Sequence, residues 1–174
     1  LGLRDLRPWP ELRERNSPVD RTLLTLAATG ALGIGYEVLV VRVLSQVAED
    51  TVYTWALLLA VYLAGSALGA AAWQRWGADA ADPDRLRRRL LLGQAVACLV
   101  GMAGLWGAEA LRKGVHEALG SGMPSALTAE AAMALAAFAL PTLLMGALFS
   151  HLCSQAQAHQ HGIGRALAFN TLGA

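Results

Sequence analysis

Residues 52–73 read VYTWALLLAVYLAGSALGAAAW, a run without a single charged side chain. A helix rises about 1.5 Å per residue, so about 20 apolar residues cross the roughly 30 Å hydrocarbon core of a bilayer. This run is long enough to do so. It lacks the alternation of apolar and polar residues that is typical of a transmembrane β-strand. The run therefore predicts a transmembrane helix.

Three further stretches around this run have the same character. They read TLLTLAATGALGIGYEVLVV at 22–41, LLLGQAVACLVGMAGLWGA at 90–108 and AAMALAAFALPTLLMGALF at 131–149. Residues 163–174 have the apolar character of a helix start but are too short to span a bilayer. We therefore expect an all-α fold, a polytopic transmembrane helix bundle with four spans and the start of a fifth.

The composition supports a membrane protein and argues against a nucleic-acid partner. Hydrophobic residues make up 55% of the 174 residues and charged residues 16%, whereas a soluble domain is about a quarter charged. The formal net charge is +1, and no basic stripe interleaves with the few aromatic residues. The two cysteines, Cys98 and Cys153, suggest no disulfide framework.

The distribution of basic residues divides the connections between the spans into two groups, one rich and one poor in Lys and Arg. Eleven of the 14 Lys and Arg residues lie before the first span, between the second and third, or after the fourth. The other three are Arg42, Arg112 and Lys113. The positive-inside rule places the N-terminus in the cytoplasm. We expect a cytoplasmic arm at 1–21, a four-helix transmembrane region at 22–149, and at 150–174 a cytoplasmic linker with the start of a truncated helix.

Glu37 is the most informative polar residue because it lies within a predicted span, roughly 8 Å from the middle of the bilayer. A charged group there costs up to about 3 kcal/mol, and the Leu, Ile and Val residues of the same helix return about 3–5 kcal/mol. The helix inserts with little margin. We therefore expect Glu37 to face another helix or a polar cavity rather than lipid.

Three neighbours are candidates to share an intramembrane polar site with Glu37. Arg42 is five residues along the helix and about 140° around it, so a pair with Glu37 needs a bend or a partner helix. Tyr53 and Thr54 begin the second span at similar depth and are candidates to hydrogen-bond the carboxyl group. Two interpretations stay open: a transport or ligand site, or a carboxyl group that only pins helices together.

Small residues mark where the helices are expected to pack closely. Gly30 and Gly33 share one helical stripe with Glu37. Gly65 and Gly69 form a G-x-x-x-G pair in the second span. Such spacings let two helix backbones approach, and they are common in membrane bundles of any function.

A proline interrupts the fourth run. Pro141 has no amide proton to donate to the carbonyl of Ala137, which predicts a kink. Kinks sometimes line sites in membrane proteins, although packing is the more frequent reason for them.

Histidines gather after the fourth run, at His151, His159 and His161, with Cys153 among them. Their spacing follows no standard zinc pattern, so we expect no metal ion and a solvated linker. The chain also has no Walker loop, no Ser-His-Asp set and no H-E-x-x-H motif. We expect no catalytic residue and no cofactor in this chain.

Four stretches taken in order resemble a known family. They are GIGYEVL followed by RVL at 33–44, LAGSALG at 63–69, LPTLLMGA at 140–147 and GRALAFNTLGA at 164–174. Together they resemble the membrane portion of bacterial multi-pass proteins of the spermidine synthase-like family. In that family, transporter-like helices are fused to a cytoplasmic aminopropyltransferase-like domain. Glu37, Arg42, Pro141 and Asn170 match motifs of the membrane part.

The resemblance implies that the whole protein transfers an aminopropyl or related group from a decarboxylated S-adenosylmethionine-type donor, bound in a domain missing from this chain. This chain would anchor that domain in the bacterial cytoplasmic (inner) membrane and handle polyamine-like cations. Its partners would be lipid, the remaining helices and the cytoplasmic domain, with a homo-oligomer left open. Two alternatives remain: a small proton- or cation-coupled transporter using Glu37, and a non-catalytic membrane anchor or assembly subunit.

Overall fold

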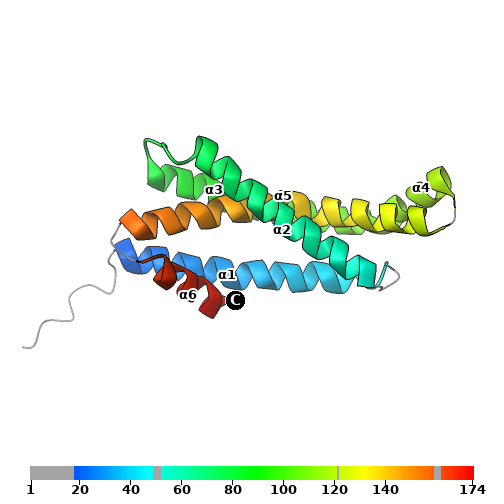
Figure 1. The fold of residues 1–174 in the computed structure, drawn as a ribbon, viewed down its shortest axis with the longest axis horizontal. Coiled ribbons are helices and arrows are strands. Elements are labelled where there is room, and N and C mark those ends of the chain that lie inside the picture. Colours follow the sequence, from blue (N-terminus) through cyan, green and yellow to red (C-terminus); the bar gives the residue numbers. More distant parts are fainter. Residues whose placement is uncertain (1–17, 49–51, 121, 159–161) are drawn as a thin grey trace, which may run out of the picture.

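The computed structural model describes residues 18–48, 52–120, 122–158 and 162–174, and within these ranges it contains helices and no strand. The helices are α1 (Pro18–Leu44), α2 (Val52–Trp76), α3 (Pro83–Trp106), α4 (Ala108–Leu119), α5 (Met123–Ala158) and α6 (Ile163–Gly173). Figure 1 shows the long helices running along one axis, with the short α6 lying beside α1. Residues 1–17 of the expected N-terminal arm lie outside the described residues.

Four helices are long and apolar enough to cross a bilayer. They cover Arg21–Leu44, Val52–Trp76, Pro83–Trp106 and Met123–Ala158. Many large apolar side chains along α1, α2 and α3 are exposed, which is expected of surfaces that face lipid rather than water. The prediction of an all-α transmembrane bundle with four spans is confirmed, and the chain is a membrane protein.

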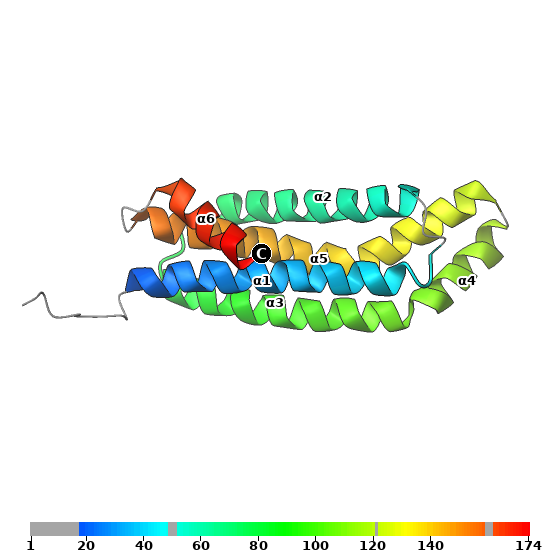
Figure 2. The same cartoon turned by 90° about the horizontal axis from the view of Figure 1, so that it is seen from below.

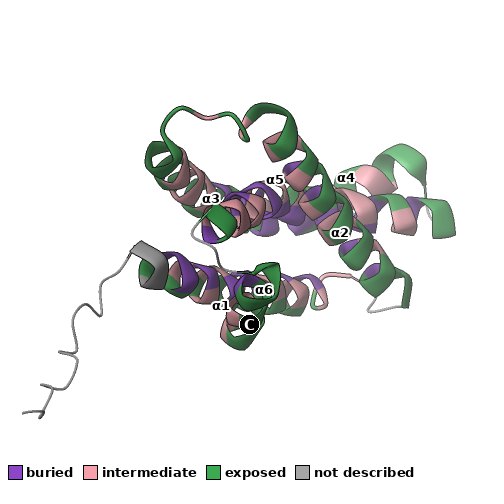
Figure 3. Ribbon diagram, turned by 60° about the vertical axis from the view of Figure 1, so that its left-hand side comes forward, coloured by how far each residue is buried: buried purple, intermediate pink, exposed green. Residues whose placement is uncertain are grey.

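The helix α5 is the centre of the bundle. At about 1.5 Å per residue its 36 residues extend about 54 Å, which exceeds the roughly 30 Å hydrocarbon core. Figure 2 shows that its first part pairs with α4 in a hairpin at one end of the molecule. Figure 3 shows buried residues concentrated along α5, where α2, α3 and α4 pack against it.

Two apolar clusters hold the helices together. One surrounds Phe138 of α5, which packs with Val40 of α1 and Leu58 of α2. The other lies where α1, α5 and α6 meet, with Leu26 and Leu152 fully buried. α1 is thus fixed to the rest of the bundle near both of its ends.

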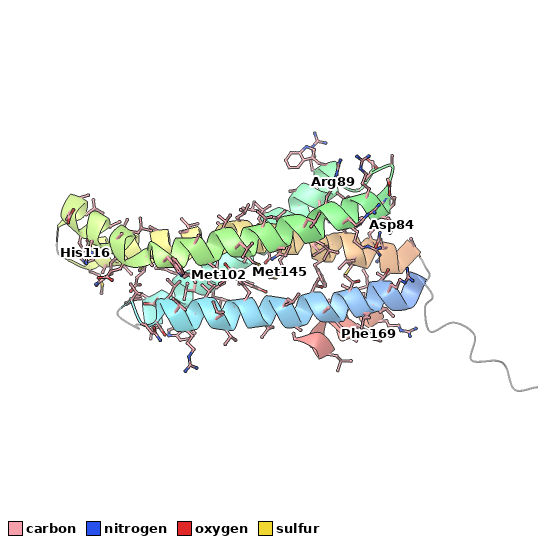
Figure 4. The ribbon with its side chains drawn as sticks, turned by 180° about the vertical axis from the view of Figure 1, so that it is seen from behind. Asp84, Arg89, Met102, His116, Met145 and Phe169 are labelled. Atoms are coloured by element: carbon pink, nitrogen blue, oxygen red, sulfur yellow. The ribbon has the colours of Figure 1, made fainter. Side chains whose placement is uncertain are left out.

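The bundle has two unlike ends. Figure 4 shows Asp84 and Arg89 at one end and His116 at the other. The first end, which we call the basic end, carries the start of α1, the α2–α3 turn and the end of α5. Here the side chain of Asp82 accepts a hydrogen bond from the amide of Arg85 at 2.9 Å and caps α3. The second end, the hairpin end, carries the α1–α2 connection and the α4–α5 hairpin.

The expected solvated linker is wrong for residues 150–158, because α5 continues to Ala158. Leu148, Leu152 and Ala156 recur every four residues and are buried, so the packed face of α5 outlasts its most hydropathic segment. His151 is buried as well. Hydropathy predicts which part of a helix crosses the lipid. It does not predict where the helix ends, because buried residues such as Leu152 and Ala156 continue the packed face beyond the apolar run.

Candidate functional site

A groove of about 470 Å³ runs along α1 near the hairpin end, and Glu37 is one of its lining residues. Ile34, Val38 and Val41 give it an apolar floor, and Trp55 joins them from α2. Glu37 is half-buried, so its carboxyl group is neither fully in lipid nor enclosed by protein. This groove is the site at which the structure places the first candidate residue.

Arg42 lines the same groove on the opposite rim. Residues five apart on an α-helix differ by about 140° in direction, and the other α1 residues of the groove point between those two directions. The ion pairs found among the described residues do not join Glu37 to Arg42. The groove therefore presents a carboxylate and a guanidinium on either side of an apolar floor.

Tyr53 and Thr54 are not among the residues that line the groove at Glu37. Tyr53 is 55% exposed at the start of α2. Thr54 is buried, and its hydroxyl donates to Oε1 of Glu130 at 2.9 Å. Because α2 packs mainly on α5 rather than on α1, the structure brings Thr54 to Glu130, and a bond from Thr54 to Glu37 stays a prediction.

Glu130 is the polar residue that sequence reasoning missed. It lies in α5 and is 7% exposed, and its Oε2 atom is buried without a hydrogen-bond partner among the described residues. A buried carboxyl group is costly unless it is bonded, so this residue marks a second candidate site. The fourth apolar run was placed from Ala131, one residue further on. The available signal was a glutamate at the edge of a span, near the depth of Thr54.

A third polar contact crosses the middle of the bundle, where Pro141 interrupts the hydrogen bonding of α5. Pro141 lacks the amide proton that would bond the carbonyl oxygen of Ala137. The hydroxyl of Tyr36 donates to that oxygen at 2.7 Å. A Cβ on Gly101 of α3 would collide with the Tyr36 hydroxyl, so α3 also comes close here. The carbonyl freed by the proline thus ties α1 to α5, and α5 continues as one helix.

The glycines selected from the sequence lie at close helix contacts. Gly30 faces Asn170 of α6, Gly33 faces Met145 of α5, Gly65 faces Thr142 of α5 and Gly69 faces Leu143 of α5. At Gly30 and Gly69 an added Cβ would strike a backbone carbonyl oxygen, which cannot rotate away as a side chain can. These positions serve the approach of helix backbones and not the groove.

His151 links the end of α5 to the α2–α3 turn. Nε1 of Trp73 donates to its Nδ1 at 3.3 Å, and its Nε2 lies 3.0 Å from the carbonyl oxygen of Pro83. Since Nδ1 accepts, Nε2 carries the proton and donates to Pro83, so the ring is neutral and both nitrogens are occupied. Within the described ranges no three His, Cys, Asp or Glu residues gather to hold a metal ion. His159 and His161 lie outside those ranges.

The groove at Glu37 is suited to binding. An apolar floor accepts hydrocarbon, a carboxylate accepts hydrogen bonds from an ammonium group, and an indole ring attracts a cation to its face. Comparisons of the chain with protein-family models, with curated proteins and with solved structures found no match.

Proposed function

We propose that this chain is the membrane region of a spermidine synthase-like protein, which anchors an aminopropyltransferase-like cytoplasmic domain and binds polyamine-like cations. One observation supports the family assignment: the stretches that carry the resemblance meet inside the bundle. Gly33 of the first stretch faces Met145 of the third, and Gly65 of the second faces Thr142 of the third. The motifs thus provide packing contacts between α1, α2 and α5, as a structural role in the membrane fold would require.

The transferase part of the proposal rests on the resemblance alone. The helices offer the anchor, and a decarboxylated S-adenosylmethionine-type donor would bind in the soluble domain. We place the basic end in the cytoplasm of a bacterial inner membrane, because it carries most of the arginines. In this orientation the hairpin end and the Glu37 groove lie toward the external face, where a cation from outside would enter.

The groove favours one kind of cation. An ammonium group at the Glu37 rim forms a charge-assisted hydrogen bond, and the ring of Trp55 adds attraction for the same charge. Methylene groups lie over the apolar floor. Arg42 repels a second positive charge at the far rim. A polyamine therefore places one terminal ammonium at Glu37 and a methylene spacer over the floor, and its other ammonium groups point out of the groove, away from Arg42.

Spermidine binding to the purified protein in detergent tests this function by calorimetry. Glu37→Gln keeps the shape of the side chain and removes its charge, so the affinity should fall by about tenfold or more. Glu117→Gln removes an exposed carboxylate from α4, away from the groove, and should leave the affinity unchanged. Equal affinity of Glu37→Gln and wild type, or no spermidine binding by wild type, would leave a non-catalytic anchor as the function.

A further inference from the structure

A second, small cavity of about 10 Å³ lies between α4 and α5 at the hairpin end, lined by the polar residues Glu130, Arg112 and His116. Its remaining walls are apolar and come from Ala48, Ala126, Ala129 and Met133. Glu37 and Arg42 do not line it, so the cavity is separate from the groove. Three elements meet here, since Thr54 of α2 holds the other oxygen of the Glu130 carboxyl group.

Two polar atoms at this cavity are buried without a partner in the described structure. They are Oε2 of Glu130, an acceptor, and Nε of Arg112, a donor. His116 is already engaged, because its Nδ1 lies 3.0 Å from the carbonyl oxygen of Arg112. Glu130 and Arg112 carry opposite charges, yet no ion pair within 4.0 Å is found between these two described residues. Leaving both groups unsatisfied would be costly, and a polar group in the cavity would reduce that cost.

The volume of the cavity limits which group can lie between Glu130 and Arg112. A volume of about 10–15 Å³ is the least that holds one water molecule, so the cavity has room for about one water. A metal cation in the same place would meet the Arg112 guanidinium and be repelled by it. A water molecule has the required chemistry, because it donates to a carboxylate and accepts from a guanidinium at the same time.

We propose that this cavity binds one water molecule, which donates to Oε2 of Glu130 and accepts from Nε of Arg112, and that this bridge clasps α4 onto α5. Ala108 is the one buried residue of α4, so few buried apolar side chains hold this helix and a polar bridge would add to them. The connection runs from α2 through Thr54 and Glu130 to Arg112 of α4. It holds the amphipathic helix against the bundle at the hairpin end.

Hydrogen–deuterium exchange of the α4 amides, residues 108–119, tests the clasp. Glu130→Gln and Arg112→Gln each remove one charge of the bridge, so each should speed exchange across α4 by about tenfold or more. The double variant should exchange no faster than the faster single variant, because both changes break the same connection. Additive effects would overturn the proposal.

Lys113→Gln is the matched control. Lys113 lies beside Arg112 in sequence but pairs at 2.9 Å with Glu109, and both side chains are more than 60% exposed. The hydrogen bond from Lys113 lowers the pKa of Glu109, yet a pair this exposed adds little to stability. This variant should exchange like wild type. If Glu130→Gln fails to fold, the Arg112→Gln comparison with Lys113→Gln still decides. A density map that shows direct contact between Glu130 and Arg112, or no water between them, would also overturn the bridge.

Discussion

At the scale of single residues, Tyr36 is the clearest test of how the bundle is held. Its hydroxyl satisfies the carbonyl oxygen of Ala137, which Pro141 leaves without its usual amide donor. Tyr36→Phe keeps the ring and removes the donor. We expect the free energy of unfolding in detergent, measured by denaturant titration, to fall by about 1 kcal/mol, as for other hydrogen bonds between membrane helices.

Two comparisons distinguish the loss of this hydrogen bond from the loss of a tyrosine hydroxyl in general. Tyr62→Phe removes a hydroxyl that donates to the sulfur of Met145 at 3.6 Å, and this weaker bond should cost less to lose. In a Pro141→Ala background residue 141 regains an amide proton for Ala137, so Tyr36→Phe should cost markedly less than in wild type. The same cost in both backgrounds would show that the carbonyl freed by the proline is not what Tyr36 satisfies.

The sequence predicts some of these residues and misses others for a physical reason. Glu37 is visible because a single charge within an apolar run stands out. Glu130 is hidden because it lies at the edge of a run, where charges are common. The bond from Thr54 to Glu130 depends on which helices are neighbours, and no local pattern in either helix encodes that. A polar residue can be found from sequence when it stands out within its own helix. Its hydrogen-bond partner cannot be found in this way, because the partner depends on which helices pack together.

At the scale of helices, the seam between α2 and α5 should be the least tolerant of added volume. A Cβ on Gly69 would strike the backbone carbonyl oxygen of Leu143, and one on Gly146 would strike that of Ser66. Gly69→Ala should therefore push the helices apart and lower the free energy of unfolding by about 1–3 kcal/mol. The melting temperature in detergent should fall accordingly.

Gly35→Ala is the control for the seam, because nothing lies within 4 Å of a Cβ added there. Alanine favours a helix over glycine by up to about 1 kcal/mol, so this change should raise the melting temperature slightly. Opposite signs at Gly69 and Gly35 are expected from close packing. A melting temperature that rises for both variants would mean that α2 and α5 are not in close contact.

The helices themselves are predicted from sequence only as far as hydropathy reports them. The four spans follow from long apolar runs, because an α-helix satisfies its own backbone hydrogen bonds within lipid. α4 was not predicted, since its charged residues read as a connection between spans. The continuation of α5 to Ala158 was missed for the same reason: polar residues such as Gln155 lower the hydropathy without ending the helix.

At the scale of the whole molecule, the groove at Glu37 and the cavity at Glu130 both lie toward the hairpin end, while most arginines lie at the basic end. Figure 2 shows α4 and the α2–α3 turn at opposite ends of the long axis. If the basic end is cytoplasmic, the groove and the cavity under α4 face the outer side. A soluble domain at the basic end would then lie on one face of the membrane, while the groove would open toward the other face.

This orientation is testable by labelling single cysteines in intact cells. In a background where Cys98 and Cys153 are replaced by alanine, Asp79→Cys lies in the exposed α2–α3 turn and Glu117→Cys on exposed α4. The positive-inside rule predicts that a membrane-impermeant maleimide labels Glu117→Cys directly and labels Asp79→Cys only after the membrane is opened. In opened membranes both cysteines should be labelled, and this measurement controls for the reactivity of each site. Direct labelling of Asp79→Cys with protection of Glu117→Cys would reverse the topology, and the groove at Glu37 would then draw its cation from the cytoplasm.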